Sequence, residues 1–145
     1  MADAQKFGEA PVFYFEDMYV GQRFTSGSHV LDEAQIKRFA SEFDPQTFHL
    51  DNEPAKATLF GGLAASGWHT AAVTMRLLVQ GGLPIAGGII GSGGELSWLK
   101  PTRPGDTLRV VRSSKSHHLA RSRTGAAFAY AARRATSMAK SFKLS

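Results

Sequence analysis

An aspartate and a histidine lie five residues apart in the stretch Asp44-Pro-Gln-Thr-Phe-His49. A carboxylate and an imidazole that converge on one water molecule supply a base and an acid, which the addition of water across a double bond requires. The alternative interpretation is structural: Asp44 ends a helix, and His49 is a loop residue whose ring bonds the backbone. The spacing alone leaves both interpretations open.

The dipeptide Ser66-Gly67 is a second candidate, because it precedes an apolar segment with helical character. The first turn of a helix leaves backbone N–H groups without intrahelical partners, and these groups favour negative charge. They could polarise a thioester carbonyl as an oxyanion hole. The alternative is an ordinary helix cap, for which Ser66 is a suitable residue.

Other common catalytic motifs are missing from the sequence. There is no cysteine, no Gly-x-Ser-x-Gly motif and no His-Glu-x-x-His motif, which excludes thiol chemistry and argues against a serine hydrolase elbow or a zinc protease. The glycine-rich segment 87–94 lacks Gly-Lys-Ser/Thr and does not begin a helix, so it does not resemble a phosphate-binding loop.

Two helices should position the candidate residues. Asp32 and Gln35 have capping-box spacing, and an apolar face follows at helical intervals, formed by Ile36, Phe39, Ala40 and Phe43. Pro45 should end this helix, which puts Asp44 at its exit. A short helix is expected at 52–54. A helix over 67–80, apolar on most sides, should be wrapped by the rest of the fold.

Strands are expected at 13–15, 22–25, 89–90, 96–99 and from Thr107 onward. One buried helix followed by strands predicts an α+β fold in which a sheet curves around that helix. The length of 145 residues fits a single domain over 1–145. No apolar run reaches the roughly 18 residues of a membrane span, and the N-terminus shows no secretory signal, so a cytoplasmic protein is expected.

The net charge of +5 is unevenly distributed. Residues 1–111 hold 9 Lys and Arg and all 12 Asp and Glu, whereas residues 112–145 hold 8 Lys and Arg and no acid. The net charge is therefore −3 before residue 112 and +8 after it. Because the main part is mildly acidic, nucleic acid is not expected as a partner.

Taken together, the stretches Phe43-Asp-Pro-Gln-Thr-Phe-His-Leu-Asp51 and Ala57-Thr-Leu-Phe-Gly-Gly-Leu-Ala-Ala-Ser-Gly-Trp-His69 resemble the MaoC-like dehydratases, the (R)-specific enoyl-CoA hydratases with a hot-dog fold. The family pattern is Gly-Asp-x-Asn-Pro-x-His-x-Asp, followed by His-Gly at the start of the central helix. The segments 14–22 and 100–108 also fit the family, so the resemblance covers about residues 13–111.

This resemblance implies an antiparallel sheet wrapped around a central helix, and reversible hydration of a trans-2-enoyl-CoA. Asp44 and His49 would hold the water, one taking its proton and the other protonating the α-carbon, and the resemblance leaves open which residue has which role. The N–H of Gly67, next to Ser66, would bind the thioester oxygen. No metal or redox cofactor is implied, and CoA enters as part of the substrate. A homodimer or higher homo-oligomer is expected, without membrane or nucleic acid as partner. An acyl-CoA thioesterase with Asp44 as base, or a non-catalytic acyl-CoA-binding protein, are the alternatives.

The sequence departs from the family pattern at three points. The family asparagine is Gln46 here, the proline has moved to Pro45, and the usual His-Gly is Ser66-Gly67. The loop between Asp44 and His49 could therefore aim the pair differently, whereas Gly67 keeps its backbone N–H. His69, inside the helix, is expected to pack or to support the site from behind.

From residue 112 onward the chain lacks the alternating strands that the family has. We hypothesise a shift of the reading frame near residue 112. With one choice of codons for residues 135–142, dropping the first two bases gives Asn-Leu-Asp-Gly-Glu-Val-Val, a polar turn followed by a strand. Two other interpretations remain: strands form anyway, since residues 127–131 alternate weakly, or the tail is a basic arm that binds nucleic acid or an acidic membrane.

Overall fold

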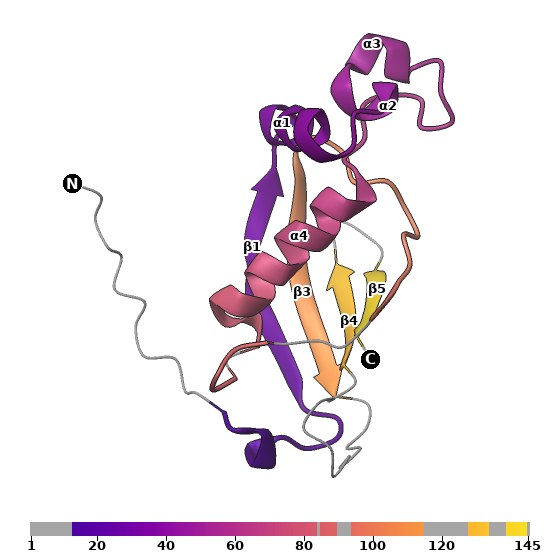
Figure 1. Ribbon diagram of the computed structural model, residues 1–145. Helices are drawn as coiled ribbons and strands as arrows, with labels where there is room; N and C mark the ends of the chain where they lie inside the picture. Colours follow the sequence, from indigo (N-terminus) through magenta and orange to yellow (C-terminus); the bar gives the residue numbers. More distant parts are fainter. Residues whose placement is uncertain (1–12, 84, 90–93, 115–127, 134–138, 145) are drawn as a thin grey trace, which may run out of the picture.

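The computed structural model describes residues 13–83, 85–89, 94–114, 128–133 and 139–144. Among these residues, one antiparallel sheet packs against a central helix, α4 (Gly67–Leu77), as Figure 1 shows. The strand order is β1-β3-β4-β5-β2. The strands are β1 (Arg23–Leu31), β2 (Gly94–Leu96), β3 (Asp106–Ser114), β4 (Phe128–Arg133) and β5 (Ala139–Leu144). The α+β architecture expected from the sequence is confirmed.

The pairing of β1 with β3 forms the part of the sheet that α4 crosses (Figure 1). Leu31 lies opposite Asp106 and Val30 opposite Thr107, and the register shifts between Thr25 and Ser28. At this irregularity the Ser26 hydroxyl accepts a 2.9 Å hydrogen bond from the backbone N–H of Val110. The side chain thus replaces a ladder bond that the bulge would otherwise leave unmade.

The core lies between α4 and the inner face of β1 and β3. Its buried hydrophobic members include Leu31, Ile36, Val73, Leu77, Leu108 and Val110. Helix α4 also buries His69, Thr70 and Thr74. The Thr74 hydroxyl donates a 2.7 Å hydrogen bond to the carbonyl of Thr70. These buried positions share one face of α4, whereas Trp68, Ala72 and Arg76 on its other face are exposed. Within the described residues, the sheet therefore covers one side of the helix, whereas the sequence predicted that the fold would wrap most of it.

Helix α1 (Glu33–Phe43) begins with the predicted capping box: Gln35 N–H donates to Asp32 Oδ1 at 2.8 Å, and Asp32 N–H donates to Gln35 Oε1 at 3.4 Å. The helix ends at Asp44, as predicted, with the Asp44 N–H bonded to Ala40. The assignment of Phe43 to the buried face is wrong, because 68% of Phe43 is exposed.

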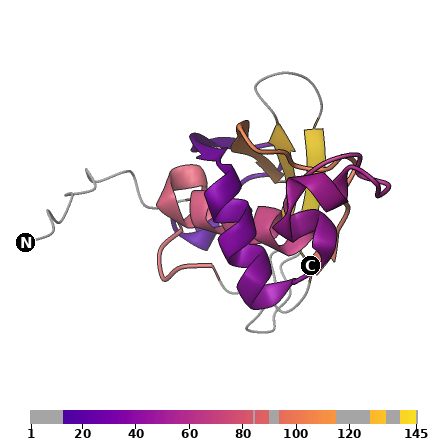
Figure 2. The same cartoon turned by 90° about the horizontal axis from the view of Figure 1, so that it is seen from above.

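Two further short helices, α2 (Thr47–Leu50) and α3 (Asn52–Ala55), follow α1. The structure confirms the helix expected near residue 52, but α2 was not predicted, and it carries His49 out of the expected loop. In both views the three helices gather at the end of the sheet where α4 begins (Figures 1 and 2).

Several predicted element bounds are wrong. Phe13 makes only an isolated bridge with Ile85, and η1 (Phe15–Asp17) is a short 3-10 helix. The strand expected at 96–99 ends at Leu96, and Ile89 lies outside any strand, while Ile90 lies outside the described residues. The central helix ends at Leu77 and is followed by a π-helical turn, η2 (Leu78–Gly82), in which Gly81 adopts φ 134°.

The basic tail contributes β4 and β5, which extend the sheet from β3 to β2. Strands in this region were one of the three interpretations of the tail, and residues 115–127 and 134–138 lie outside the described residues. A changed reading frame is a property of the gene and stays a prediction. In the described part of the chain, no helix is long and apolar enough to span a membrane.

Candidate active site

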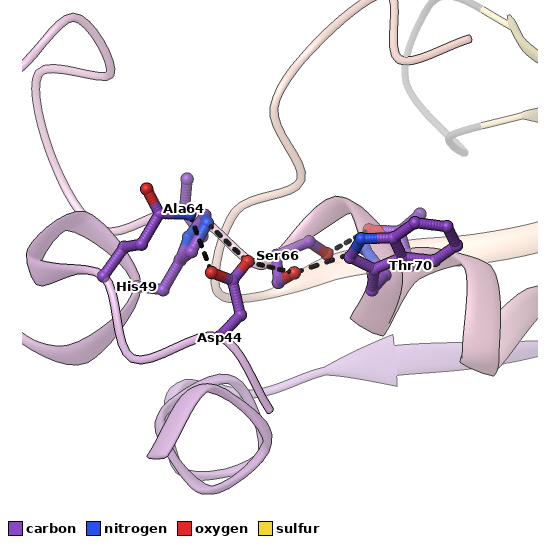
Figure 3. A network of polar contacts seen from close by, with 7 residues as sticks. Asp44, His49, Ala64, Ser66 and Thr70 are labelled. Carbon is purple, nitrogen blue, oxygen red and sulfur yellow. Dashed lines mark hydrogen bonds and ion pairs between the residues drawn. The ribbon is translucent and has the colours of Figure 1, made fainter. Parts of the chain in front are cut away.

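The end of α1 and the start of α2 bring Asp44 and His49 together. The Gln46 N–H bonds the carbonyl of Asp44 at 2.7 Å, and the His49 N–H bonds the carbonyl of Gln46 at 2.9 Å. This tight turn leaves Nε2 of His49 at 3.4 Å from Oδ2 of Asp44 (Figure 3). The altered proline and glutamine positions therefore still allow the two side chains to converge.

His49 is held from behind by the backbone. Its Nδ1 lies 2.6 Å from the carbonyl oxygen of Ala64, and since a carbonyl only accepts, Nδ1 carries the hydrogen. In the neutral ring this leaves the lone pair on Nε2, the atom that faces Asp44. Only 5% of His49 is exposed, and the ring of Phe48 packs edge-on against it. The imidazole is thus fixed in orientation and tautomer.

Asp44 receives hydrogen bonds at both carboxylate oxygens. Ser66 Oγ donates to Oδ2 at 2.6 Å, and Gln46 Nε2 donates to Oδ1 at 2.7 Å. Partial burial raises the pKa of the Asp44 carboxyl, but these two bonds and the neighbouring His49 together outweigh it, so the pKa lies below its ordinary value. Asp44 is therefore a carboxylate at neutral pH, and it acts as an acceptor.

Ser66 joins the carboxylate to the central helix. Its hydroxyl caps α4 by accepting from the N–H of Trp68 at 3.2 Å, while it donates to Asp44 (Figure 3). Gly67 is the first residue of α4, so its N–H is one of the groups that a helix leaves without an intrahelical partner. The structure thus places Ser66 in contact with Asp44, and Gly67 follows it as the first residue of α4.

All four predicted site residues line one pocket of about 500 Å³. Most of the other lining side chains are apolar, and they come from α2 and the residue before it, the 59–65 segment, the first turn of α4 and the segment before β3. They are Phe48, Leu59, Phe60, Ala65, Trp68, Leu99 and Pro101, together with Trp98 and the polar Gln46, Thr70, Lys100 and Thr102. Such a concave apolar site with a few convergent polar groups suits a small-molecule ligand.

Arg103 supports the pocket wall from outside the lining. Its guanidinium donates to the carbonyls of Gly62 at 2.8 Å and Leu63 at 3.0 Å, and also to the carbonyl of Phe60. The next residue, Ala64, bonds the two middle residues of α2: its N–H donates to the carbonyl of Phe48 and its carbonyl accepts from the His49 ring. Arg103 therefore fixes the segment that orients the imidazole.

Sequence reasoning missed Gln46 as a donor to Asp44, the carbonyl of Ala64, and Trp98 and Arg103. Only the Pro-Thr-Arg-Pro-Gly-Asp turn pointed to the neighbourhood of Arg103, as a family feature. His69, expected to pack or to support the site, is buried and stacked on Phe39, with the rings 4.6 Å apart. Within the described ranges, no three His, Asp or Glu side chains are grouped so as to hold a metal ion.

Comparison with known proteins adds independent observations. The model of the MaoC like domain matches residues 18–128. The uncharacterized protein YdeM of Bacillus subtilis is 36% identical over 99 residues, which are 66% of this chain and 69% of that protein.

Two solved structures resemble this one over most of their length. A MaoC-like dehydratase from Rhodospirillum rubrum is 50% identical, with a TM-score of 0.84 over 91% of this chain and 92% of that chain. The R-hydratase PhaJ1 from Pseudomonas aeruginosa, in its unliganded form, is 20% identical, with a TM-score of 0.71 over 89% of this chain and 80% of that chain. The second likeness concerns the fold alone. With the central helix and antiparallel sheet, these matches confirm the expected hot-dog fold.

Proposed function

The chain belongs to the MaoC-like domain family, and from that membership we propose that it adds water reversibly to a trans-2-enoyl-CoA thioester. The observation that carries the proposal is the pair of acceptor atoms in the pocket. Nε2 of His49 and Oδ2 of Asp44 lie 3.4 Å apart, and the first turn of α4 begins beside them. The description of the Rhodospirillum rubrum relative as a dehydratase supports the same reaction class.

The pair is suited to hold and activate a water molecule. The neutral imidazole presents a lone pair at Nε2, because Nδ1 donates to Ala64. The carboxylate of Asp44 presents a second acceptor. One water that donates a hydrogen to each is oriented with its oxygen lone pairs toward the substrate. Fixing a nucleophile in this manner removes much of the entropic cost of the encounter.

The proton then follows a closed path in the proposed reaction. His49 takes a proton from the water as general base while the oxygen bonds the β-carbon of the enoyl group. Asp44, as an adjacent anion, stabilises the imidazolium. The imidazolium returns the proton to the α-carbon, which regenerates the neutral ring. One water and one carbon–carbon double bond are consumed, and a 3-hydroxyacyl thioester is formed.

The negative charge that develops on the thioester oxygen needs a donor. We assign this role to the N–H of Gly67, since it stands at the positive end of the α4 dipole. Loss of one such donor typically slows an acyl-transfer enzyme by about 10²–10³-fold. Ser66 contributes indirectly, because it holds both Asp44 and the capped end of α4.

The proposal needs no metal or redox cofactor, and it takes CoA as part of the substrate. We further propose a homodimer or higher homo-oligomer in the cytoplasm, as the family resemblance implies. Light scattering coupled to gel filtration measures the oligomeric state directly, and a monomeric mass at assay concentrations would refute that part.

The decisive experiment follows the ultraviolet absorbance of the conjugated enoyl thioester with crotonyl-CoA and longer trans-2-enoyl-CoAs. The wild type should remove the absorbance. Asp44→Asn removes the anion that stabilises the imidazolium, so it should reduce kcat/KM by about 10²–10³-fold. Glu42→Gln is the matched control, because it neutralises an exposed carboxylate two residues away. Equal rates in Asp44→Asn and the wild type would refute the role of Asp44.

Two further measurements distinguish the two alternative functions. A thiol reagent detects free CoA, whose release from saturated acyl-CoA would identify a thioesterase with Asp44 as base. If calorimetry detects binding of acyl-CoA and neither assay detects turnover, the protein is a non-catalytic binding protein.

A further inference from the structure

The indole of Trp98 lies directly against the backbone of Gly67. A Cβ atom built on Gly67 would lie 2.5 Å from Cε2 and 2.6 Å from Nε1 of Trp98. Real Cβ atoms do not approach other heavy atoms this closely, so the contact exists only because residue 67 has no side chain. Trp98 comes from the irregular segment between β2 and β3, far from Gly67 in sequence.

Trp98 is a wall of the pocket rather than a member of the core. It lines the pocket together with Gly67 and Ser66, and 46% of its surface is exposed. Its ring also meets Trp68 edge to face, with centroids 5.9 Å apart. One side of the indole therefore rests on the start of α4, and accessible surface remains toward the pocket and solvent.

This position matters for the reaction proposed above, on which the following inference rests. If the thioester oxygen binds the Gly67 N–H, the carbonyl carbon lies in front of the first turn of α4. The α-carbon is bonded to that carbonyl carbon. A substituent on the α-carbon is therefore brought to the same end of the pocket as the indole, which cannot retreat toward Gly67 without overlap.

We infer that Trp98 is a specificity-determining residue that restricts the substrate to acyl groups unbranched at the α-carbon. Apolar pockets discriminate one methyl or methylene group by about 10–200-fold. A flat ring backed by the helix is well suited to such exclusion, since overpacking by one methyl group from the pocket side is costly when the ring cannot move back against Gly67.

The test compares two thioesters that differ by one α-methyl group, crotonyl-CoA and 2-methylcrotonyl-CoA. The ratio of kcat/KM for the branched over the linear substrate should rise about tenfold or more in Trp98→Ala, and less in Trp98→Phe. Tyr19→Ala is the control, because Tyr19 is an exposed aromatic (63%) that does not line the pocket. An unchanged ratio in Trp98→Ala, or an equal rise in Tyr19→Ala, would overturn the inference.

A binding measurement keeps this test independent of turnover. Calorimetry with the saturated analogues butyryl-CoA and 2-methylbutyryl-CoA gives the ratio of the two Kd values for each folded protein. If the wild type hydrates neither enoyl thioester, the proposed function fails. The role of Trp98 then stands if Trp98→Ala narrows the Kd ratio about tenfold, and falls if the ratio stays the same.

Discussion

The hydroxyl of Ser66 donates a 2.6 Å hydrogen bond to Oδ2 of Asp44 while it accepts the N–H of Trp68. One small side chain thus ties the end of α1 to the beginning of α4. The bond favours the ionised carboxylate and is one of the causes that hold the pKa of Asp44 below its ordinary value. Because the same hydroxyl caps α4, the charge state of Asp44 and the position of α4 both depend on Ser66 Oγ.

Ser66→Ala should therefore raise the pKa of Asp44. The carbon-13 shift of the Asp44 carboxyl should then titrate at higher pH in this variant than in the wild type. Loss of the cap should also lower the free energy of unfolding by about 1 kcal/mol. An NMR titration of the Asp44 carboxyl and urea unfolding measure the two effects separately.

Ser41→Ala is the control for this prediction. Ser41 is also a hydroxyl that bonds the backbone, with Oγ donating to the carbonyl of Arg38 at 2.8 Å, but it is exposed on α1 and does not line the pocket. Ser66→Thr keeps the hydroxyl and should retain most of the wild-type titration of Asp44. An Asp44 carboxyl that titrates at the same pH in Ser66→Ala and in the wild type would contradict the coupling.

Those parts of the fold that depend on neighbouring residues could be predicted from sequence. The capping box at Asp32, the stop at Pro45 and the cap at Ser66 each need only three or four consecutive residues, and each is present. Helix α2 has no such signal. Its four residues are tied by bonds from Ala64 to Phe48 and His49, and these partners are 15 or 16 positions away.

The candidate site was predictable as a set of residues but not as a geometry. The family pattern pointed to Asp44, His49 and the Ser66-Gly67 pair, which the structure brings into one pocket. The tautomer of His49 depends on the carbonyl of Ala64, and the shape of the pocket depends on Trp98. Neither contact leaves a periodic pattern in the sequence, because each joins a helical residue to an irregular segment distant along the chain.

Arg103→Ala should loosen the segment that holds His49. The guanidinium donates to three carbonyls of residues 60–63, and carbonyls left without partners cost about 1–3 kcal/mol. We expect the free energy of unfolding to fall by about 2–3 kcal/mol, and kcat/KM to fall more steeply than this loss of folded protein explains. Urea unfolding and rates at a temperature where the variant is fully folded distinguish the two.

Two variants control for the charge and for the arginine itself. Arg103→Lys keeps the charge but not the planar fork of donors, so it should recover only part of the lost stability. Arg109→Ala removes an exposed arginine whose guanidinium donates to the Ser28 hydroxyl at 3.2 Å, and a surface change of this kind should stay within about 0.5 kcal/mol. If Arg103→Ala were no less stable than Arg109→Ala, the hydrogen bonds from Arg103 to residues 60–63 would contribute nothing to stability.

His69 should make stability depend on pH below neutrality. Burial, and then the nearby His29 and Arg38, lower the pKa of His69 below its ordinary value, and its Nδ1 has no hydrogen-bond partner among the described residues. Between the folded and the ordinary pKa the unfolded chain binds more protons than the folded one. The free energy of unfolding should therefore decrease as the pH falls below about 6.5.

His69→Phe should remove this contribution and keep the stacking on Phe39. It also eliminates a buried nitrogen without a partner, so the stability at neutral pH should be unchanged or about 1 kcal/mol higher. Urea unfolding at several pH values gives, for each protein, the slope of the free energy of unfolding against pH. His29→Gln should keep most of the wild-type slope, since burial of His69 is the largest cause of its lowered pKa. Identical slopes for His69→Phe and the wild type would show that another group is responsible.

Gly67→Ala should displace Trp98, because the new methyl group would lie 2.5 Å from its Cε2 atom. Two effects oppose each other. Alanine is favoured over glycine in helices by up to about 1 kcal/mol, whereas overpacking costs about 1–3 kcal/mol where neighbours cannot move. The indole is 46% exposed and can swing outward, so we expect only a small change in stability together with a more solvated indole.

The fluorescence of Trp98 reports this displacement. The sequence has 2 tryptophans, so a Trp68→Phe background leaves Trp98 as the single emitter. In this background Gly67→Ala should shift the emission to longer wavelength. Gly27→Ala should not, since a Cβ on Gly27 meets nothing within 4 Å. An unshifted spectrum in Gly67→Ala would mean that α4 moves instead of the indole, in which case the cost must appear in the free energy of unfolding.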